Sequence, residues 1–98
     1  MTPGCCPHYH EAIELIGRRW TGAILAVLLS EDRPLRFNEI AQAVPDLSDR
    51  LLTERLKELE ERGLVTKRDG AYAVTPMGRD LEPALTQLQA WGQRWLTA

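Results

Sequence analysis

The sequence predicts a mainly α-helical domain with one small β-hairpin, an α+β fold. Two observations lead to this prediction. Apolar residues recur at helical spacing through most of the chain, whereas strand signals are confined to residues 64–75. That short region contains Asp69-Gly70, a pair that favours the tight type I′ turn of a hairpin.

The composition indicates one domain, residues 1–98, with a formal net charge of −2. No apolar run is long enough to cross a membrane, so a soluble cytoplasmic protein without a membrane partner is expected. The charge does not by itself indicate a partner. Basic residues nevertheless gather in one stretch, which contains Arg50, Arg55, Lys57, Arg62, Lys67 and Arg68.

Three helices are expected in the first half of the chain. His8–Ile16 forms the first, and Gly17 ends it. The second covers residues 18–30 and is apolar around most of its circumference, so it should lie at the centre of the fold. Pro34 separates it from a third helix over residues 35–44.

The fourth helix carries the clearest local signals. Ser48 is a suitable N-cap, and Gly63 is suited to the left-handed residue that follows the last turn. Between them, Leu52, Leu56 and Leu59 recur at steps of four and three residues. These leucines are therefore expected to form the buried side of the helix.

Two strands, residues 64–68 and 71–75, follow the fourth helix. Thr75 then caps a last helix that runs to the C-terminus with a bend near Pro83. Two helices joined by a short turn and followed at once by a hairpin are typical of a winged helix-turn-helix domain. Residues 7–75 would form its DNA-binding core, and residues 76–98 a dimerisation helix.

The outward side of the fourth helix presents Arg50, Thr53 and Lys57 opposite the leucines. In a helix-turn-helix protein this part of the second helix enters the major groove, where arginine can form two hydrogen bonds to guanine. Glu54 suits that position only if it pairs with Arg50 or accepts from a cytosine. A merely solvated helix face is the alternative. The residues expected to contact DNA are Arg36, Ser48, Arg50, Thr53, Lys57, Lys67 and Arg68, with Arg62 a weaker candidate for a phosphate contact.

The C-terminal region carries a second apolar stripe. Leu81, Leu85, Leu88 and Trp95 recur at helical spacing, and Trp91 adds further apolar area. The stripe could pack on its own domain, but little core remains to be covered after the hairpin. These five residues are therefore expected to form a homodimer interface.

Cysteine and histidine residues cluster at the N-terminus, where Cys5, Cys6, His8 and His10 are all able to bind a soft metal. Four ligands so close in sequence do not easily surround one ion, so no metal site is assigned. Cys6 precedes the first helix, whose N-terminus and a cationic His8 would stabilise a thiolate. An ordinary thiol remains the alternative. No third catalytic group or glycine-rich phosphate loop accompanies the cluster, so an enzyme is not expected.

Four stretches in the same order resemble the HxlR-type branch of the MarR-related winged-helix regulators: CPHYHEAIELIGRRWTGAILAVL, RFNEIAQAV, LSDRLLTERLKELEERGLV and YAVTPMGRDLEPALTQLQAWG. The resemblance implies a homodimeric bacterial regulator on an inverted-repeat operator, paired through its first and last helices. It also implies that Cys6 senses electrophiles or oxidants. The chain differs in its short wing, KRDGAYAV, which lacks the usual proline-containing connection.

The sequence thus predicts a sequence-specific DNA-binding transcriptional regulator, either a repressor or a dual regulator, which binds double-stranded DNA as a homodimer. No cofactor is expected, and a small-molecule effector is left open. Two alternatives remain: a winged-helix module that binds an acidic protein, and a metal-responsive regulator that uses Cys5, Cys6, His8 and His10.

Overall fold

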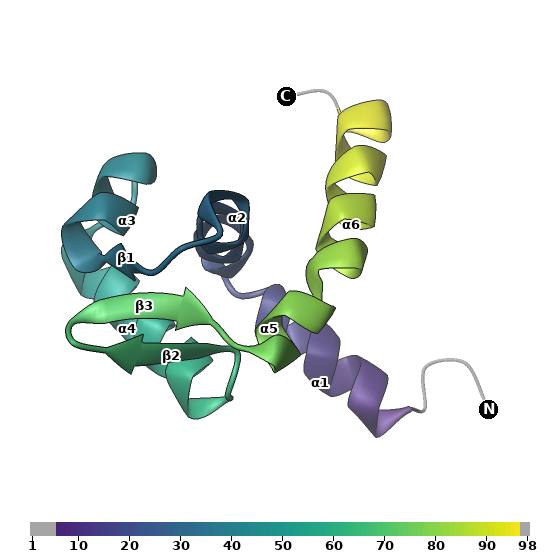
Figure 1. Cartoon of the computed structure of the whole chain (residues 1–98). Coiled ribbons are helices and arrows are strands. Elements are labelled where there is room, and N and C mark those ends of the chain that lie inside the picture. Colours follow the sequence, from purple (N-terminus) through teal and green to yellow (C-terminus); the bar gives the residue numbers. More distant parts are fainter. Residues whose placement is uncertain (1–5, 97–98) are drawn as a thin grey trace.

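The computed structural model describes residues 6–96 and shows a mainly helical fold with a small antiparallel sheet, as the sequence predicts. The hairpin turn lies at one side of the molecule, and α1 and α6 lie at the other (Figure 1). The elements are α1 (Pro7–Ile16), α2 (Thr21–Glu31), β1 (Leu35–Arg36), α3 (Phe37–Ala43), α4 (Asp49–Glu61), β2 (Val65–Arg68), β3 (Ala71–Val74), α5 (Pro76–Asp80) and α6 (Glu82–Trp95).

Helix α2 is central, as predicted, because Ile24, Leu25 and Leu28 are buried in the core. It begins later than residue 18, the start that the sequence predicted. Trp20 adopts a left-handed conformation with φ of 76°, so the regular helix starts at Thr21. The chain therefore turns sharply between α1 and α2.

The prediction that residues 35–44 are all helical is wrong at its start. Leu35 and Arg36 form β1, which pairs with β3 at Leu35–Tyr72 and Arg36–Ala71. The sheet consequently has three strands in the order β1-β3-β2. Burial of Leu35 in the core favours the extended conformation, and pairing supplies the hydrogen bonds that a helical turn would otherwise provide.

Glu39 fixes where α3 begins. Its carboxylate accepts a hydrogen bond from the Arg36 amide nitrogen at 2.9 Å and another from the Arg33 guanidinium at 3.0 Å. The Arg36 amide, followed by Arg33, lowers the pKa of Glu39 below its ordinary value of 4.5. The charged form therefore stabilises the helix start.

We expect Glu39→Gln to remove a contribution to stability that depends on pH. Because the folded-state pKa of Glu39 is lowered, this contribution is fully present above the unfolded pKa and is lost as pH falls through the folded pKa. The difference in stability between wild type and Glu39→Gln should therefore shrink below about pH 4.5. Denaturant unfolding followed by circular dichroism across this range measures it, and a constant difference would contradict the assignment.

Helix α4 agrees with its sequence signals. The Ser48 hydroxyl oxygen accepts from the Leu51 amide at 3.1 Å, which confirms the N-cap. Leu52, Leu56 and Leu59 are almost fully buried, which confirms the apolar stripe. The helix ends before Gly63, whose φ of 85° suits glycine because a side chain is disfavoured in that region.

The hairpin also agrees with the prediction. Asp69 and Gly70 have φ of 52° and 79°, both positive as a type I′ turn requires. Arg68 pairs with Ala71, so the loop between β2 and β3 contains only these two residues.

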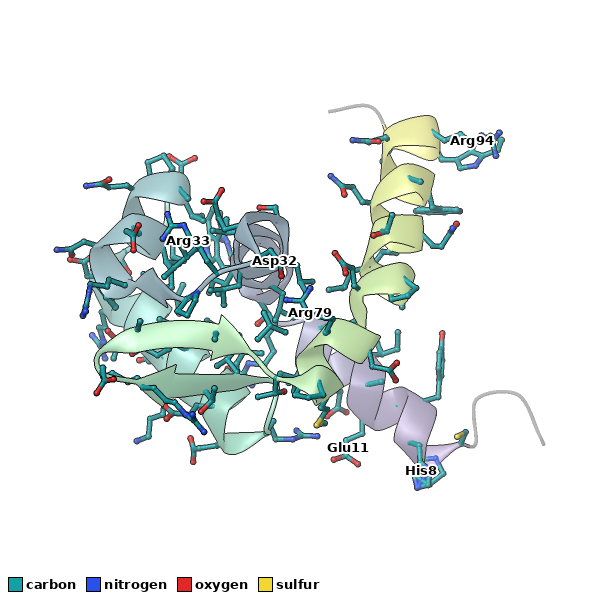
Figure 2. The ribbon with its side chains drawn as sticks, viewed as in Figure 1. His8, Glu11, Asp32, Arg33, Arg79 and Arg94 are labelled. Carbon is teal, nitrogen blue, oxygen red and sulfur yellow. The ribbon has the colours of Figure 1, made fainter. Side chains whose placement is uncertain are left out.

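The predicted single C-terminal helix is two helices instead. Thr75 caps α5, accepting from the Gly78 amide at 3.2 Å, and the chain breaks at Leu81 before α6. Pro83 lies in the first turn of α6, where its missing amide proton costs nothing. An ion pair of 3.0 Å between Arg79 and Asp32 fastens α5 to the end of α2 (Figure 2).

Within residues 6–96, no helix is both long and apolar enough to cross a membrane.

Candidate nucleic-acid interface and dimer surface

Arg50 lies on the first turns of α4, opposite the buried leucines, with its side chain 90% exposed. Its Nε atom is 3.7 Å from Oε1 of Glu54, so the two residues form the ion pair that the sequence suggested. Lys57 lies exposed seven residues after Arg50, about two helical turns further along. This side of α4 therefore offers two long basic side chains that no apolar packing restrains.

Ser48 and Thr53 are less free than the basic residues. The Ser48 hydroxyl already caps α4, and the Thr53 hydroxyl donates to the Asp49 carbonyl oxygen at 2.8 Å. Thr53 can still present its methyl group or an oxygen lone pair to a ligand. Both residues thus stabilise the helix in addition to any contact that they make.

The sheet presents a separate set of basic side chains. Lys67 and Arg68 are exposed on β2, and the Lys67 amine lies 5.3 Å from the centre of the Tyr72 ring. Arg36, on β1, donates from Nη1 to the Asp69 carbonyl oxygen at 3.1 Å. The structure thus brings Arg36 to the hairpin turn, where it braces the wing tip.

Two residues of the basic stretch face elsewhere. Arg55 is only 9% exposed, and its Nε donates to the Arg19 carbonyl oxygen at 2.9 Å. Arg62 pairs with Glu11 of α1 at 2.8 Å. A helical projection of the sequence already places Arg55 on the buried side of α4, because Arg55 lies 60° from Leu52 and so falls within the apolar stripe.

The C-terminal stripe divides into two parts. Leu81 and Leu85 are half-buried against the core of their own domain. Leu88, Trp91 and Trp95 are 55%, 53% and 67% exposed. The alternative of packing within the domain therefore describes the first two residues, whereas the last three remain uncovered.

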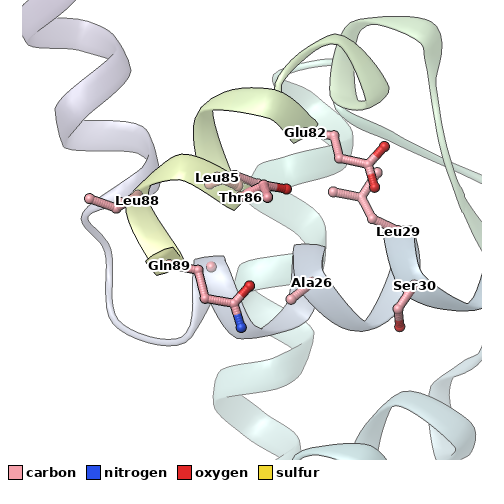
Figure 3. A pocket seen from close by; sticks show the side chains of 9 residues that line it. Ala26, Leu29, Ser30, Glu82, Leu85, Thr86, Leu88 and Gln89 are labelled. Atoms are coloured by element: carbon pink, nitrogen blue, oxygen red, sulfur yellow. The ribbon is translucent and has the colours of Figure 1, made fainter. Parts of the chain in front are cut away.

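A groove of about 430 Å³ separates α6 from α2 (Figure 3). Leu29 and Leu85 give it an apolar floor, and Leu88 lies at its rim. Ser30, Thr86, Gln89 and Glu82 add polar groups, and no basic side chain lines it. Through Leu88, the groove adjoins the uncovered part of the stripe. Tyr9 and Ile13 of α1 also expose apolar side chains.

Cys6 is the residue that immediately precedes α1, and its thiol is free and half-buried. Its position at the helix N-terminus agrees with the sequence, while Cys5 lies outside the described residues. His8 and His10 follow on the first turns of α1. Within residues 6–96, no three His, Cys, Asp or Glu side chains are grouped as a metal site would require.

Two helices joined by a short turn, followed by a hairpin with exposed basic residues, define a winged helix-turn-helix protein. Residues 15–98 match the model of the HxlR-like helix-turn-helix family, and the chain belongs to that family. It is a transcriptional regulator with a DNA-binding helix-turn-helix, related to the MarR-like proteins.

Similar proteins and solved structures support this family membership. The chain is 38% identical over 99 residues to the HTH-type transcriptional regulator YvaP of Bacillus subtilis (strain 168), covering 93% of this chain and 89% of YvaP. Quinone-bound YodB from B. subtilis superposes with a TM-score of 0.85 at 39% identity, covering 92% of this chain and all of that one. The redox regulator HypR in its oxidised form gives 0.77 at 31% identity, covering 95% and 100%.

Proposed function

We propose that this regulator binds an inverted-repeat operator in double-stranded DNA as a homodimer, with one α4 in each major groove. The observation that carries the proposal is the exposure of Arg50 and Lys57 on the side of α4 opposite its buried leucines. Arginine there can recognise a guanine edge. Lys67, Arg68 and the guanidinium of Arg36 would contact phosphates and supply affinity without sequence preference.

The dimer would form through α6 and α1. Leu88, Trp91 and Trp95 expose apolar area that a soluble monomer would gain by burying. A second copy offers an identical surface, as a two-fold interface requires. Because α1 and α6 lie opposite the hairpin turn, pairing there leaves the wings free to reach DNA (Figure 1).

Selection of bound duplexes from a random pool, followed by footprinting, tests this function. We expect one palindrome with half-sites about one helical turn apart, and affinity that falls steeply with salt. A protein-interaction module that uses the basic face for an acidic partner would instead show no preferred duplex. We further propose that the protein is cytoplasmic and bacterial. We also propose that it is a repressor, because a dimer bound over a promoter excludes the polymerase.

We also propose that Cys6 makes operator binding responsive to electrophiles or oxidants. Related structures include a quinone-bound YodB and reduced and oxidised forms of HypR. Cys6 has the free thiol and the helix N-terminal position that such a response needs. Modification there adds bulk beside α1, which the dimer is proposed to use.

We expect quinone, aldehyde or peroxide treatment to change operator affinity by about 5- to 150-fold in wild type, the usual range of coupling between sites. Cys6→Ser should abolish the response, and Cys5→Ser should retain most of it. Fluorescence anisotropy with labelled operator measures the change. Equal affinity before and after complete thiol alkylation would reduce Cys6 to an ordinary cysteine, and metal analysis of protein purified without chelator separates the metal-sensor alternative.

A further inference from the structure

Helix α1 is attached to the rest of the protein mainly by polar contacts. None of its residues, all of which the structure describes, is buried; Leu15 and Ile16 are half-buried, and of these Leu15 packs against the core. Apolar packing alone therefore fixes its direction weakly. The groove between α1 and α4, of about 280 Å³, is lined chiefly by charged side chains: Glu11, Glu14, Arg18, Glu58, Glu61 and Arg62.

One polar link joins the middle of α1 to the end of α4, the proposed recognition helix. Oε2 of Glu11 lies 2.8 Å from Nη2 of Arg62, the residue that follows the last turn of α4. Glu11 projects from α1 on the same side as His8 (Figure 2). This pair connects a helix of the proposed dimer surface to the helix proposed to read DNA.

A second link joins α4 to the turn between α1 and α2. Arg55 donates from Nε to the Arg19 carbonyl oxygen at 2.9 Å, and its Nη1 lies 3.4 Å from Oε1 of Glu58. Glu58 also pairs with Arg18 at 3.2 Å. Among residues 6–96, Arg55 is the one charged residue that is buried, so its contacts are shielded from water.

The turn that Arg55 holds is strained. Trp20 has φ of 76°, a region that a bulky side chain disfavours, and such a conformation persists only when its surroundings impose it. The Arg19 guanidinium lies 5.3 Å from the centre of the Trp20 ring, and the Thr21 amide donates to the Arg18 carbonyl oxygen at 3.1 Å. The direction of α1 depends on this turn because the helix leaves directly from it.

We propose that Arg55 and the Glu11–Arg62 pair are positioning residues that fix the direction of α1 relative to the recognition helix. The inference rests on the proposed function, since it matters for DNA only if α1 contributes to the dimer. A displacement of α1 would then change the spacing of the two copies of α4, and both half-sites could no longer be contacted together. Arg62 thereby acts through Glu11 and not through a phosphate.

A charge exchange tests the outer link. An exposed ion pair changes an equilibrium constant by a factor of up to about five, and a dimer contains two such pairs. Glu11→Arg and Arg62→Glu should therefore each weaken operator binding by about 2- to 25-fold. The double variant should recover most of the wild-type affinity. If Arg62 contacted phosphate instead, Glu11→Arg would leave binding equal or stronger and the double variant would stay weak, which would overturn the proposal.

A distance measurement tests the inference without DNA. Spin labels on His8→Cys and Glu60→Cys, in protein that also carries Cys5→Ser and Cys6→Ser, report the position of α1 relative to α4. Labelled chains diluted into unlabelled protein give only distances within one protomer. We expect one narrow distribution of distances between the two labels when Glu11 and Arg62 are unchanged. Glu11→Arg or Arg62→Glu alone should broaden it, and the double variant should restore a narrow distribution.

Arg55 is tested in the same labelled protein. Arg55→Met removes its charge and hydrogen bonds and is expected to broaden the distribution, whereas Arg55→Lys should retain part of the order. Distributions identical to wild type in Arg55→Met and both single exchange variants would overturn the inference. If these variants broaden the distance distribution but the wild-type protein selects no operator duplex, the inference stands and the proposed function is rejected.

Discussion

Leu88→Glu is expected to leave the protein folded, to convert it to a monomer and to lower operator affinity by about 10²- to 10⁴-fold. Leu88 is 55% exposed, so a carboxylate there can stay in water without disturbing the core. In a dimer the same carboxylate would be buried beside apolar side chains without a partner. The loss is large because a dimer held on one half-site has the second half-site at high effective concentration.

Gln93→Glu is the matched control for this variant. It adds the same charge to the same helix, but five residues from Leu88, about 140° around the helix, where the side chain is exposed. We expect it to remain dimeric. Sedimentation velocity and operator titration measure both effects, and a wild-type protein that is monomeric at micromolar concentration would reject the proposed interface.

The parts of the fold that the sequence predicted are those decided by neighbouring residues. A serine hydroxyl caps α4, leucines one turn apart form its buried side, and Gly63 ends it. The Asp69-Gly70 turn is likewise a local preference of two residues for positive φ. Each of these features depends on interactions within a few residues, so each could be read without knowing the rest of the structure.

The features that the sequence did not reveal depend on distant contacts. Strand β1 has two residues and exists through its pairing with β3, far along the chain. The link from Arg55 to the Arg19 carbonyl oxygen likewise requires α4 to lie beside the turn between α1 and α2. The division of the C-terminal stripe follows from where the core ends, since Leu85 reaches the core and Leu88 does not.

Arg50→Ala is expected to lower operator affinity by about 1–3 kcal/mol per half-site and to relax sequence preference at one position in each. The guanidinium is the group on α4 best placed to form two hydrogen bonds to a guanine, because its side chain is 90% exposed. Removing it also leaves Glu54 without its partner at 3.7 Å, and an unpaired carboxylate near phosphates weakens binding to any sequence.

Two controls separate the loss of base recognition from the change in charge. Lys67→Ala removes a charge from the sheet and should weaken all duplexes alike, with the salt dependence reduced by about one counterion per protomer. Arg50→Ala combined with Glu54→Gln restores the net charge of the helix. If Arg50 reads a base, this double variant still fails to distinguish the operator from a duplex altered at that position. Operator preference equal to that of wild type, measured by competition with altered duplexes, would mean that α4 does not enter the groove through Arg50.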